Sequence, residues 1–138
     1  MVAETNSYSF EAITTAVNLI KAGARFIATN PDVTSPAEKG IEPACGSVSA
    51  LIAAATGHQP YFLGKPNPLM MRYALEHLGA HSAETTMVGD RMDTDVLAGT
   101  ESGMQTVLVL SGLTRRKDVD GFPFKPGRIV DSVADLIE

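Results

Sequence analysis

The chain has 138 residues, of which 44% are hydrophobic and 20% charged, and 11 Lys+Arg against 16 Asp+Glu give a formal net charge of −5 at pH 7. This composition excludes a disordered tail, and the acidic balance without a long basic run excludes nucleic acid as the main partner. A single cysteine, Cys45, excludes an internal disulfide framework and suits a cytoplasmic protein, while no apolar run reaches the roughly 18 to 20 residues that would indicate a membrane span.

The N-terminal part is predicted to begin with a helix over residues 10–20, where apolar residues recur at helical spacing. Ser9 is a suitable N-cap for this helix, and Gly23 is a suitable stop. Residues 25–29 form a short β-prone run, which ends in the turn cluster at residues 30–32.

A long loop is predicted next, over residues 32–46, because two prolines and two glycines interrupt it. Loops of this length inside compact domains are more often functional than not. The Ala-rich run over residues 47–56 is closed by Gly57 and predicts a buried helix.

From residue 60 onward, β-prone runs alternate with helical patterns. Strands are predicted at residues 61–63, 85–88, 106–110 and 129–130, and helices at residues 68–78, 94–102 and 133–137. The first of these helices is expected to bury a stripe of Met71, Ala74, Leu75 and Leu78. This alternation predicts an α/β fold with a parallel sheet, whose ligands bind beyond the carboxyl ends of the strands. Three segments lie at such ends, residues 64–66, 89–95 and 111–112.

Three carboxylates, those of Asp90, Asp93 and Asp95, lie within six residues directly after a predicted strand. Carboxylates this close repel one another, and one arrangement that would relieve the repulsion is a hard cation such as Mg²⁺, which takes one or two protein carboxylates. The alternative is an N-cap with solvated acids at the start of a helix, where the helix dipole tolerates negative charge. The spacing alone leaves both interpretations open.

Lys65 stands between Gly64 and Pro66 on a short loop at the end of another strand, which we expect to belong to the same sheet. A lysine held near a metal-binding carboxylate would neutralise phosphate oxygens in a transition state. The alternative is a surface lysine in a turn.

Together these elements resemble the haloacid-dehalogenase (HAD) superfamily of phosphatases, most closely its NagD-like branch. The strings that carry the resemblance are G-A-R-F-I-A-T-N-P-D (23–32), E-P-A-C-G-S (42–47), G-K-P-N-P (64–68) and V-G-D-R-M-D-T-D-V-L-A-G (88–99). The resemblance implies part of a doubly wound, Rossmann-like parallel sheet and part of an α/β cap domain. Residues 1–59 would be the partial cap, and residues 60–138 the C-terminal half of the catalytic core.

The resemblance also implies roles for individual residues. Lys65 would neutralise the phosphate, Asp90 would bind Mg²⁺, and Asp95 would support the metal through water or orient Lys65. The substrate side would be lined by Arg91, Met92, Asp93 and Thr94, with Asn30 and Asp32 facing the substrate from the cap. For the last two, a strand-ending Asx turn is the competing interpretation.

Two elements of the family pattern are missing from their expected places. They are the D-x-D pair after an N-terminal strand, which provides the aspartate nucleophile, and the Ser/Thr phosphate-binding motif that follows it. Asp118-Val119-Asp120 imitates this pair but follows a basic run rather than a buried strand. The implied activity is Mg²⁺-dependent hydrolysis of phosphomonoesters of small sugars or nucleotides, and this chain alone is expected to be inactive or weakly active.

Other functions are compatible with parts of the pattern. A non-catalytic module that binds Mg²⁺ and phosphate would use the same residues, a receiver-like phosphoacceptor lacks its pair of acids, and a dinucleotide-binding fold lacks its G-x-G-x-x-G loop. Because the strand at 61–63 would lack its usual neighbour, we expect self-association or pairing with a missing N-terminal half.

Overall fold

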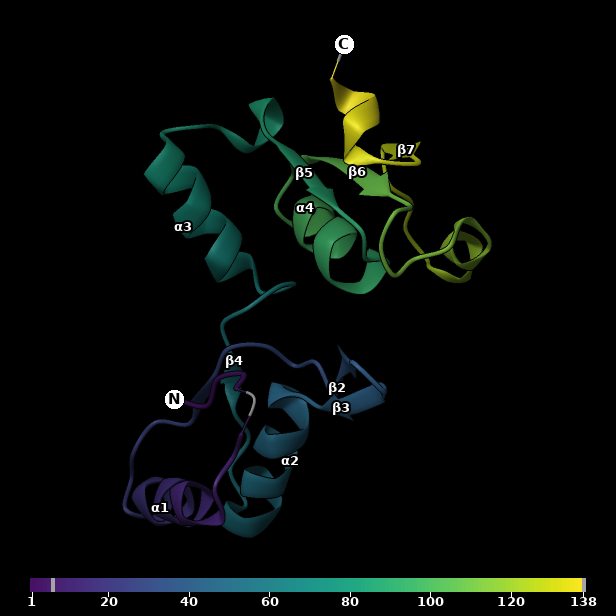
Figure 1. The fold of residues 1–138 in the computed structure, drawn as a ribbon. Helices are drawn as coiled ribbons and strands as arrows, with labels where there is room; N and C mark the ends of the chain where they lie inside the picture. The colour runs from purple at the N-terminus through teal and green to yellow at the C-terminus, as the bar shows by residue number, and fades with distance from the viewer. Residues whose placement is uncertain (6, 138) are drawn as a thin grey trace. The chain divides into compact units, whose positions relative to one another are not determined.

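The computed structural model describes residues 1–5 and 7–137, which form two compact units, Met1–Gly64 and Lys65–Glu138. Both combine helices with parallel strands, as the sequence predicts (Figure 1). No helix of the described residues is both long enough and apolar enough to cross a bilayer.

Two helices pack together in the first unit. Helix α1 (Phe10–Lys21) begins as predicted, with the Ser9 hydroxyl accepting a hydrogen bond from the Ala12 amide at 3.0 Å. Helix α2 (Cys45–Thr56) begins two residues before the predicted start and ends at Gly57, whose φ of 75° is the left-handed conformation that glycine adopts readily. The buried cluster between them consists of Ile20, Phe26, Val48, Ile52 and Ala53.

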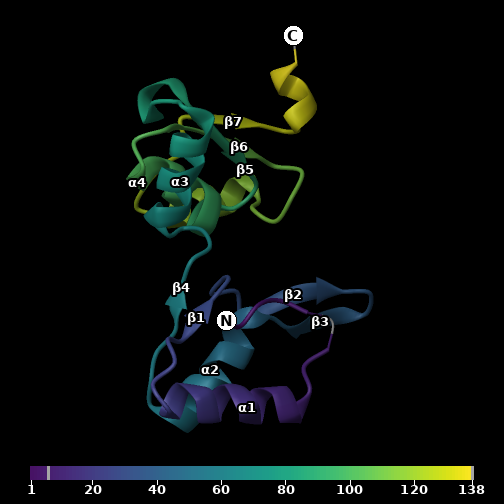
Figure 2. The same cartoon turned by 90° about the vertical axis from the view of Figure 1, so that its left-hand side faces the viewer.

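The predicted strand at 61–63 is β4 (Tyr61–Phe62), and its partner differs from the expected one. It pairs in parallel with β1 (Ile27–Ala28) of the same unit, with Ile27 opposite Tyr61 (Figure 2). The expectation that it shares a sheet with the strand after residue 85 is therefore wrong. A short apolar run signals a strand but carries no information about which strand it joins.

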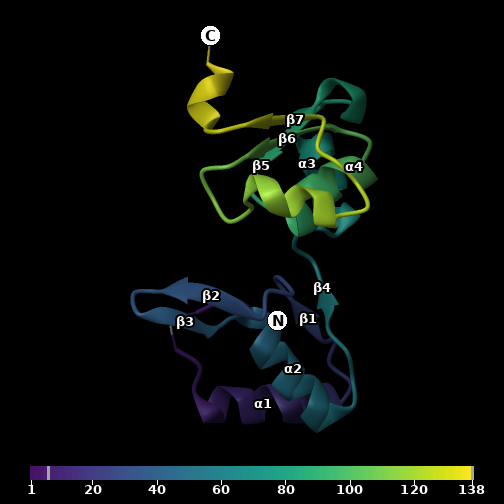
Figure 3. The same cartoon turned by 90° about the vertical axis from the view of Figure 1, so that its right-hand side faces the viewer.

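The predicted loop at 32–46 is also wrong, because most of it forms an antiparallel hairpin of β2 (Thr34–Ala37) and β3 (Gly40–Pro43) (Figure 3). No hydrophobic alternation marks the hairpin, since both strands are largely exposed. Its prolines are tolerated because each strand of a two-stranded sheet has a free edge.

The second unit contains the predicted parallel sheet, in the order β5-β6-β7. Its strands are β5 (Thr86–Gly89), β6 (Gln105–Val109) and β7 (Arg128–Val130), each within about one residue of its predicted position. The strands are parallel, so their carboxyl ends lie along one edge of the sheet. This edge carries the segments that come after Gly89 and Val109.

The predicted helix at 94–102 is two different elements. A π-helix over Met92–Val96 is followed by helix α4 (Leu97–Glu101), which packs closely on the sheet. A Cβ on Gly99 would lie 2.6 Å from Thr106 and 2.8 Å from Met87, so only glycine permits this approach. The cluster of Met92, Val96, Leu108 and Val119 is buried nearby.

Helix α3 (Pro68–Leu78) begins at its predicted N-cap, Asn67, and ends at Gly79, but its predicted stripe is wrong. Only Met71 of the four stripe residues is buried, and Leu78 is 68% exposed. The remaining short helices are 3-10 turns at Ser82–Glu84, Arg116–Gly121 and Val133–Leu136, so the predicted closing helix is a single 3-10 segment.

Candidate active site

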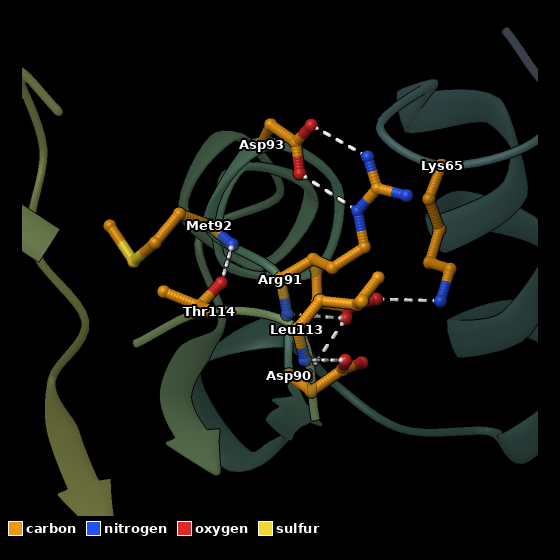
Figure 4. A network of polar contacts seen from close by, with 8 residues as sticks. Lys65, Asp90, Arg91, Met92, Asp93, Leu113 and Thr114 are labelled. Atoms are coloured by element: carbon orange, nitrogen blue, oxygen red, sulfur yellow. Dashed lines mark hydrogen bonds and ion pairs between the residues drawn. The ribbon is translucent and has the colours of Figure 1, made fainter. Parts of the chain in front are cut away.

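The candidate site of the second unit is centred on Asp95, whose side chain is only 4% exposed. One carboxylate oxygen, Oδ1, accepts a hydrogen bond from Lys65 Nζ at 2.6 Å. The Lys65 side chain is 42% exposed, and its ammonium group is held by Asp95 (Figure 4). This arrangement fixes the position of a cation without burying its whole side chain.

The second oxygen of Asp95, Oδ2, holds the backbone after β5. It accepts hydrogen bonds from the amides of Asp90 and Arg91, both at 3.1 Å. Gly89 lies against the same carboxylate so closely that a Cβ there would overlap it. Asp95 therefore connects Lys65 to the loop that carries Asp90.

The π-helix explains how Asp95 reaches this position. The Arg91 carbonyl accepts from the amides of both Asp95, at 3.1 Å, and Val96, at 3.0 Å. The second bond spans five residues instead of the usual four, so the turn is wider than an α-helical one. The wide turn buries Met92 and Val96 in the hydrophobic cluster while Asp95 faces the end of β5.

The Asp90 carboxylate is held on one side only. Its Oδ2 accepts from the Leu113 amide at 2.8 Å (Figure 4), and its backbone carbonyl accepts from the Thr114 amide at 3.1 Å. Gly112 is in direct contact with the carboxylate. Among the described residues none donates to Oδ1, which is the oxygen available to a ligand.

Arg91 and Asp93 form a two-point ion pair beside these residues, with Nε and Nη2 of the arginine at 3.0 and 2.7 Å from the two carboxylate oxygens. The hydrogen bonds from Arg91 lower the pKa of Asp93 below its ordinary value. Their side chains are 29% and 53% exposed, so both can contact a ligand.

Two of the predicted substrate-lining residues point into the protein instead. Met92 is 1% exposed and packs in the hydrophobic cluster, and its amide donates to Thr114 Oγ1 at 3.3 Å. Thr94 is 8% exposed. Neither side chain offers appreciable surface to a ligand, so we propose neither as a substrate contact.

Asn30 and Asp32 belong to the first unit, where they form an Asx turn. This is the alternative to a substrate contact that the sequence leaves open. The Asn30 side-chain oxygen accepts from the Asp32 amide at 3.1 Å, and its nitrogen donates to Glu4 at 3.2 Å. A role in substrate binding stays a prediction for both residues.

Leu113 and Thr114 also belong to the site, and the sequence does not predict them. It predicts only that the two residues before them, Ser111 and Gly112, follow a strand. Leu113 and Thr114 both act on Asp90 through backbone amides, which nearly any residue type supplies. The one available signal is the glycine at 112, in the loop after β6, because a glycine often marks a site where another group approaches the backbone closely.

A divalent cation fits the site with Asp90 as a single protein carboxylate. No group of three or more His, Cys, Asp or Glu residues suited to a metal occurs within residues 1–5 and 7–137. Mg²⁺ needs only one or two protein carboxylates, because waters and substrate phosphate complete its octahedron. The open Oδ1 of Asp90 is an oxygen of the right kind.

The model of HAD-hydrolase-like proteins matches residues 62–136, which is more than half of the chain. The chain belongs to the HAD-like hydrolase family. It is 59% identical over 138 residues to the dihydroxyacetone phosphatase of Corynebacterium glutamicum, covering 100% of this chain and 50% of that protein. It is 45% identical over 136 residues to the ribonucleotide monophosphatase NagD of Escherichia coli, covering 99% of this chain and 53% of NagD.

Solved structures of HAD-like hydrolases agree with this assignment. The NagD structure superposes with a TM-score of 0.86 over 96% of this chain and 52% of NagD, at 45% identity. The p-nitrophenyl phosphatase of Archaeoglobus fulgidus superposes with a TM-score of 0.89 over 98% of this chain and 54% of that protein, at 38% identity. The resemblance to the NagD-like branch is thus confirmed, and the chain spans about half the length of these relatives.

Proposed function

We propose that this chain provides the phosphate-binding and metal-binding half of a Mg²⁺-dependent phosphomonoesterase of the HAD-like family. The observation that carries the proposal is the Asp95 carboxylate, which holds Lys65 Nζ at 2.6 Å and the Asp90 amide at 3.1 Å. The Asp95 carboxylate thereby fixes both the cationic Lys65 side chain and the backbone of Asp90, the proposed metal ligand. Relatives named as phosphatases support the same reaction.

Lys65 would bind the phosphate of the substrate. Its ammonium group is oriented by Asp95, and such a fixed positive charge stabilises the negative charge on phosphate oxygens in the transition state. Arg91 is kept in one orientation by Asp93 and would line the substrate side with it.

Asp90 would provide one ligand for Mg²⁺ through its free Oδ1. When bound, the ion would neutralise phosphate charge and position the phosphate group for attack. The protein residues provide the orientation, since Leu113 fixes one oxygen of the acid and leaves the other accessible.

The substrates would be small phosphorylated molecules, sugar phosphates or nucleotides, hydrolysed in the cytoplasm. The relatives' names include dihydroxyacetone phosphatase, ribonucleotide monophosphatase and 5'-nucleotidase. In this proposal residues 1–59 are part of a cap that carries Asn30 and Asp32 toward the substrate, and residues 60–138 are the C-terminal half of the catalytic core.

We propose no nucleophile within this chain. Asp118 and Asp120, which imitate the nucleophile pair, lie in the 3-10 helix Arg116–Gly121. Asp118 accepts from the Arg115 amide and Asp120 pairs with Lys125, so each has a local structural contact. We therefore propose that turnover requires pairing with an N-terminal half, and that the chain alone is inactive or weakly active.

The test is a binding and turnover experiment on the purified chain. Two-dimensional NMR would monitor the amides of Asp90 and Leu113 during titration with Mg²⁺, and then with tungstate as a phosphate analogue. We expect Asp90→Asn to abolish the Mg²⁺ response and Lys65→Met to abolish the tungstate response. Lys125→Met is the matched control, since Lys125 also pairs with an aspartate, Asp120, at 2.7 Å, in the same unit.

Turnover of p-nitrophenyl phosphate would be measured on the same samples. Binding of both probes with little turnover supports the proposal, and hydrolysis gained on adding the N-terminal half of a close relative would exclude a purely non-catalytic binding module. If neither probe perturbs the site, the proposal is overturned.

A further inference from the structure

We infer that Thr114 is a positioning residue that sets the orientation of the Asp90 carboxylate through the loop of residues 112–114. The inference rests on the proposed function, because it concerns how Asp90 presents an oxygen to a cation. None of the three loop residues carries a charge, and all act on Asp90 by contact or through amides.

The loop contacts Asp90 at three points. Gly112 lies directly against the carboxylate, the Leu113 amide donates to Oδ2 at 2.8 Å, and the Thr114 amide donates to the Asp90 carbonyl at 3.1 Å. The first two contacts fix the side chain and the third fixes the backbone. Together they prevent the carboxylate from turning both oxygens toward one ligand.

The Thr114 side chain ties this loop to the other side of the site. Its Oγ1 accepts from the Met92 amide at 3.3 Å, and Met92 is buried in the hydrophobic cluster with Val96 and Leu108 (Figure 4). Thr114 therefore connects an exposed loop to a rigid core residue. Without this bond, the loop would keep its contacts with Asp90 but lose its hydrogen bond to the π-helix.

The geometry makes Asp90 a one-oxygen ligand. Leu113 occupies Oδ2, while Oδ1 has no donor among the described residues. A carboxylate held in this way binds a small octahedral cation through one oxygen and disfavours the two-oxygen binding that larger cations accept. Thr114 would therefore raise the affinity for Mg²⁺ without touching the ion.

The test compares Thr114→Val, which removes the acceptor at nearly constant volume, with Thr114→Ser, which keeps it. Mg²⁺ alone is titrated into the 138-residue chain, and dissociation constants are obtained from amide shifts. We expect Thr114→Val to weaken Mg²⁺ binding about tenfold, the lower end of the effect of residues that orient metal ligands, and Thr114→Ser to restore most of it. Tungstate binding, which depends on Lys65, should stay unchanged in both variants.

A second measurement does not depend on the metal. Hydrogen exchange of the Leu113 amide, measured without Mg²⁺, should accelerate in Thr114→Val and not in Thr114→Ser. Equal Mg²⁺ affinity and equal Leu113 protection in all three proteins overturn the inference, as does a parallel loss of Mg²⁺ and tungstate binding. If the unsubstituted chain fails to bind Mg²⁺ while Leu113 responds as expected, the proposed metal function is overturned and the orienting role of Thr114 stands.

Discussion

Replacing Asp95 separates the two tasks of its carboxylate. Asp95→Ala removes the acceptor of the Asp90 and Arg91 amides and the partner of Lys65. Asp95→Asn keeps an oxygen that can accept from both amides, but turns an amide donor toward the Lys65 ammonium. The two variants therefore differ chiefly in the backbone hydrogen bonds.

The expected magnitudes depend on burial. Each partly buried amide that loses its acceptor costs about 1 kcal/mol, the lower end of the penalty for unsatisfied donors, so two amides cost about 2 kcal/mol. The Lys65 contact adds about 1 kcal/mol at most, because its side chain is 42% exposed and screened by solvent. We expect losses of about 3 kcal/mol for Asp95→Ala and about 1 kcal/mol for Asp95→Asn.

The assay is native-state hydrogen exchange of the Asp90 and Arg91 amides, which reports local opening in the second unit. Asp95→Ala should expose both amides, while Asp95→Asn should leave them largely protected. Asp120→Ala, which breaks the exposed pair with Lys125, is the control and should leave both amides unchanged. Equal loss of protection in Asp95→Asn and Asp95→Ala would refute the reasoning, because charge rather than backbone bonding would then hold the loop.

Three further predictions concern single sites. Gly89→Ala should destabilise the second unit in thermal denaturation, since the added Cβ overlaps the Asp95 carboxylate, and an unchanged midpoint would contradict the packing described. The pKa of Asp93 is lowered by hydrogen bonds from Arg91, so the pair stabilises the fold above the ordinary value of 3.8 and loses this contribution as the pH falls below it. Asp93→Asn should flatten the acid limb of a stability-against-pH curve. Cys45 is fully buried, so Ellman's reagent should react slowly with the native chain and rapidly in urea, and fast native labelling would refute this burial.

The parallel sheet and the ends of its strands could be predicted because both depend on local patterns. The apolar run that forms β6 and the alternation of strands with helices indicate parallel pairing, and this in turn places Asp90 at the carboxyl end of β5. The position of Lys65 near an acid also follows from the sequence. The acid that it contacts, Asp95, is one of the two that the resemblance implies, Asp90 and Asp95.

Other features depend on contacts that are distant in sequence. Nothing in residue type distinguishes the π-helix from an α-helix, and one partner of Asp95 in this turn, Lys65, is 30 residues away in the sequence. The hairpin of β2 and β3 lacks an apolar face, and the partner of β4 is 34 residues away in the register that pairs Ile27 with Tyr61. Leu113 acts on Asp90 through its backbone amide, which nearly every residue type has, so the sequence does not indicate this contact.

The π-helix makes the site sensitive to the number of residues between β5 and Asp95 as well as to their identity. Deleting one residue between Arg91 and Asp95 would move Asp95 one position back along the turn, which rotates its side chain by about 100° relative to β5. The Asp95 carboxylate would then no longer be aligned with both Lys65 and the amides of Asp90 and Arg91, even if every remaining residue were unchanged. Point substitutions at exposed positions such as Asp93 leave this spacing intact. The number of residues between Arg91 and Asp95 is therefore as much a part of this site as the side chains that form it.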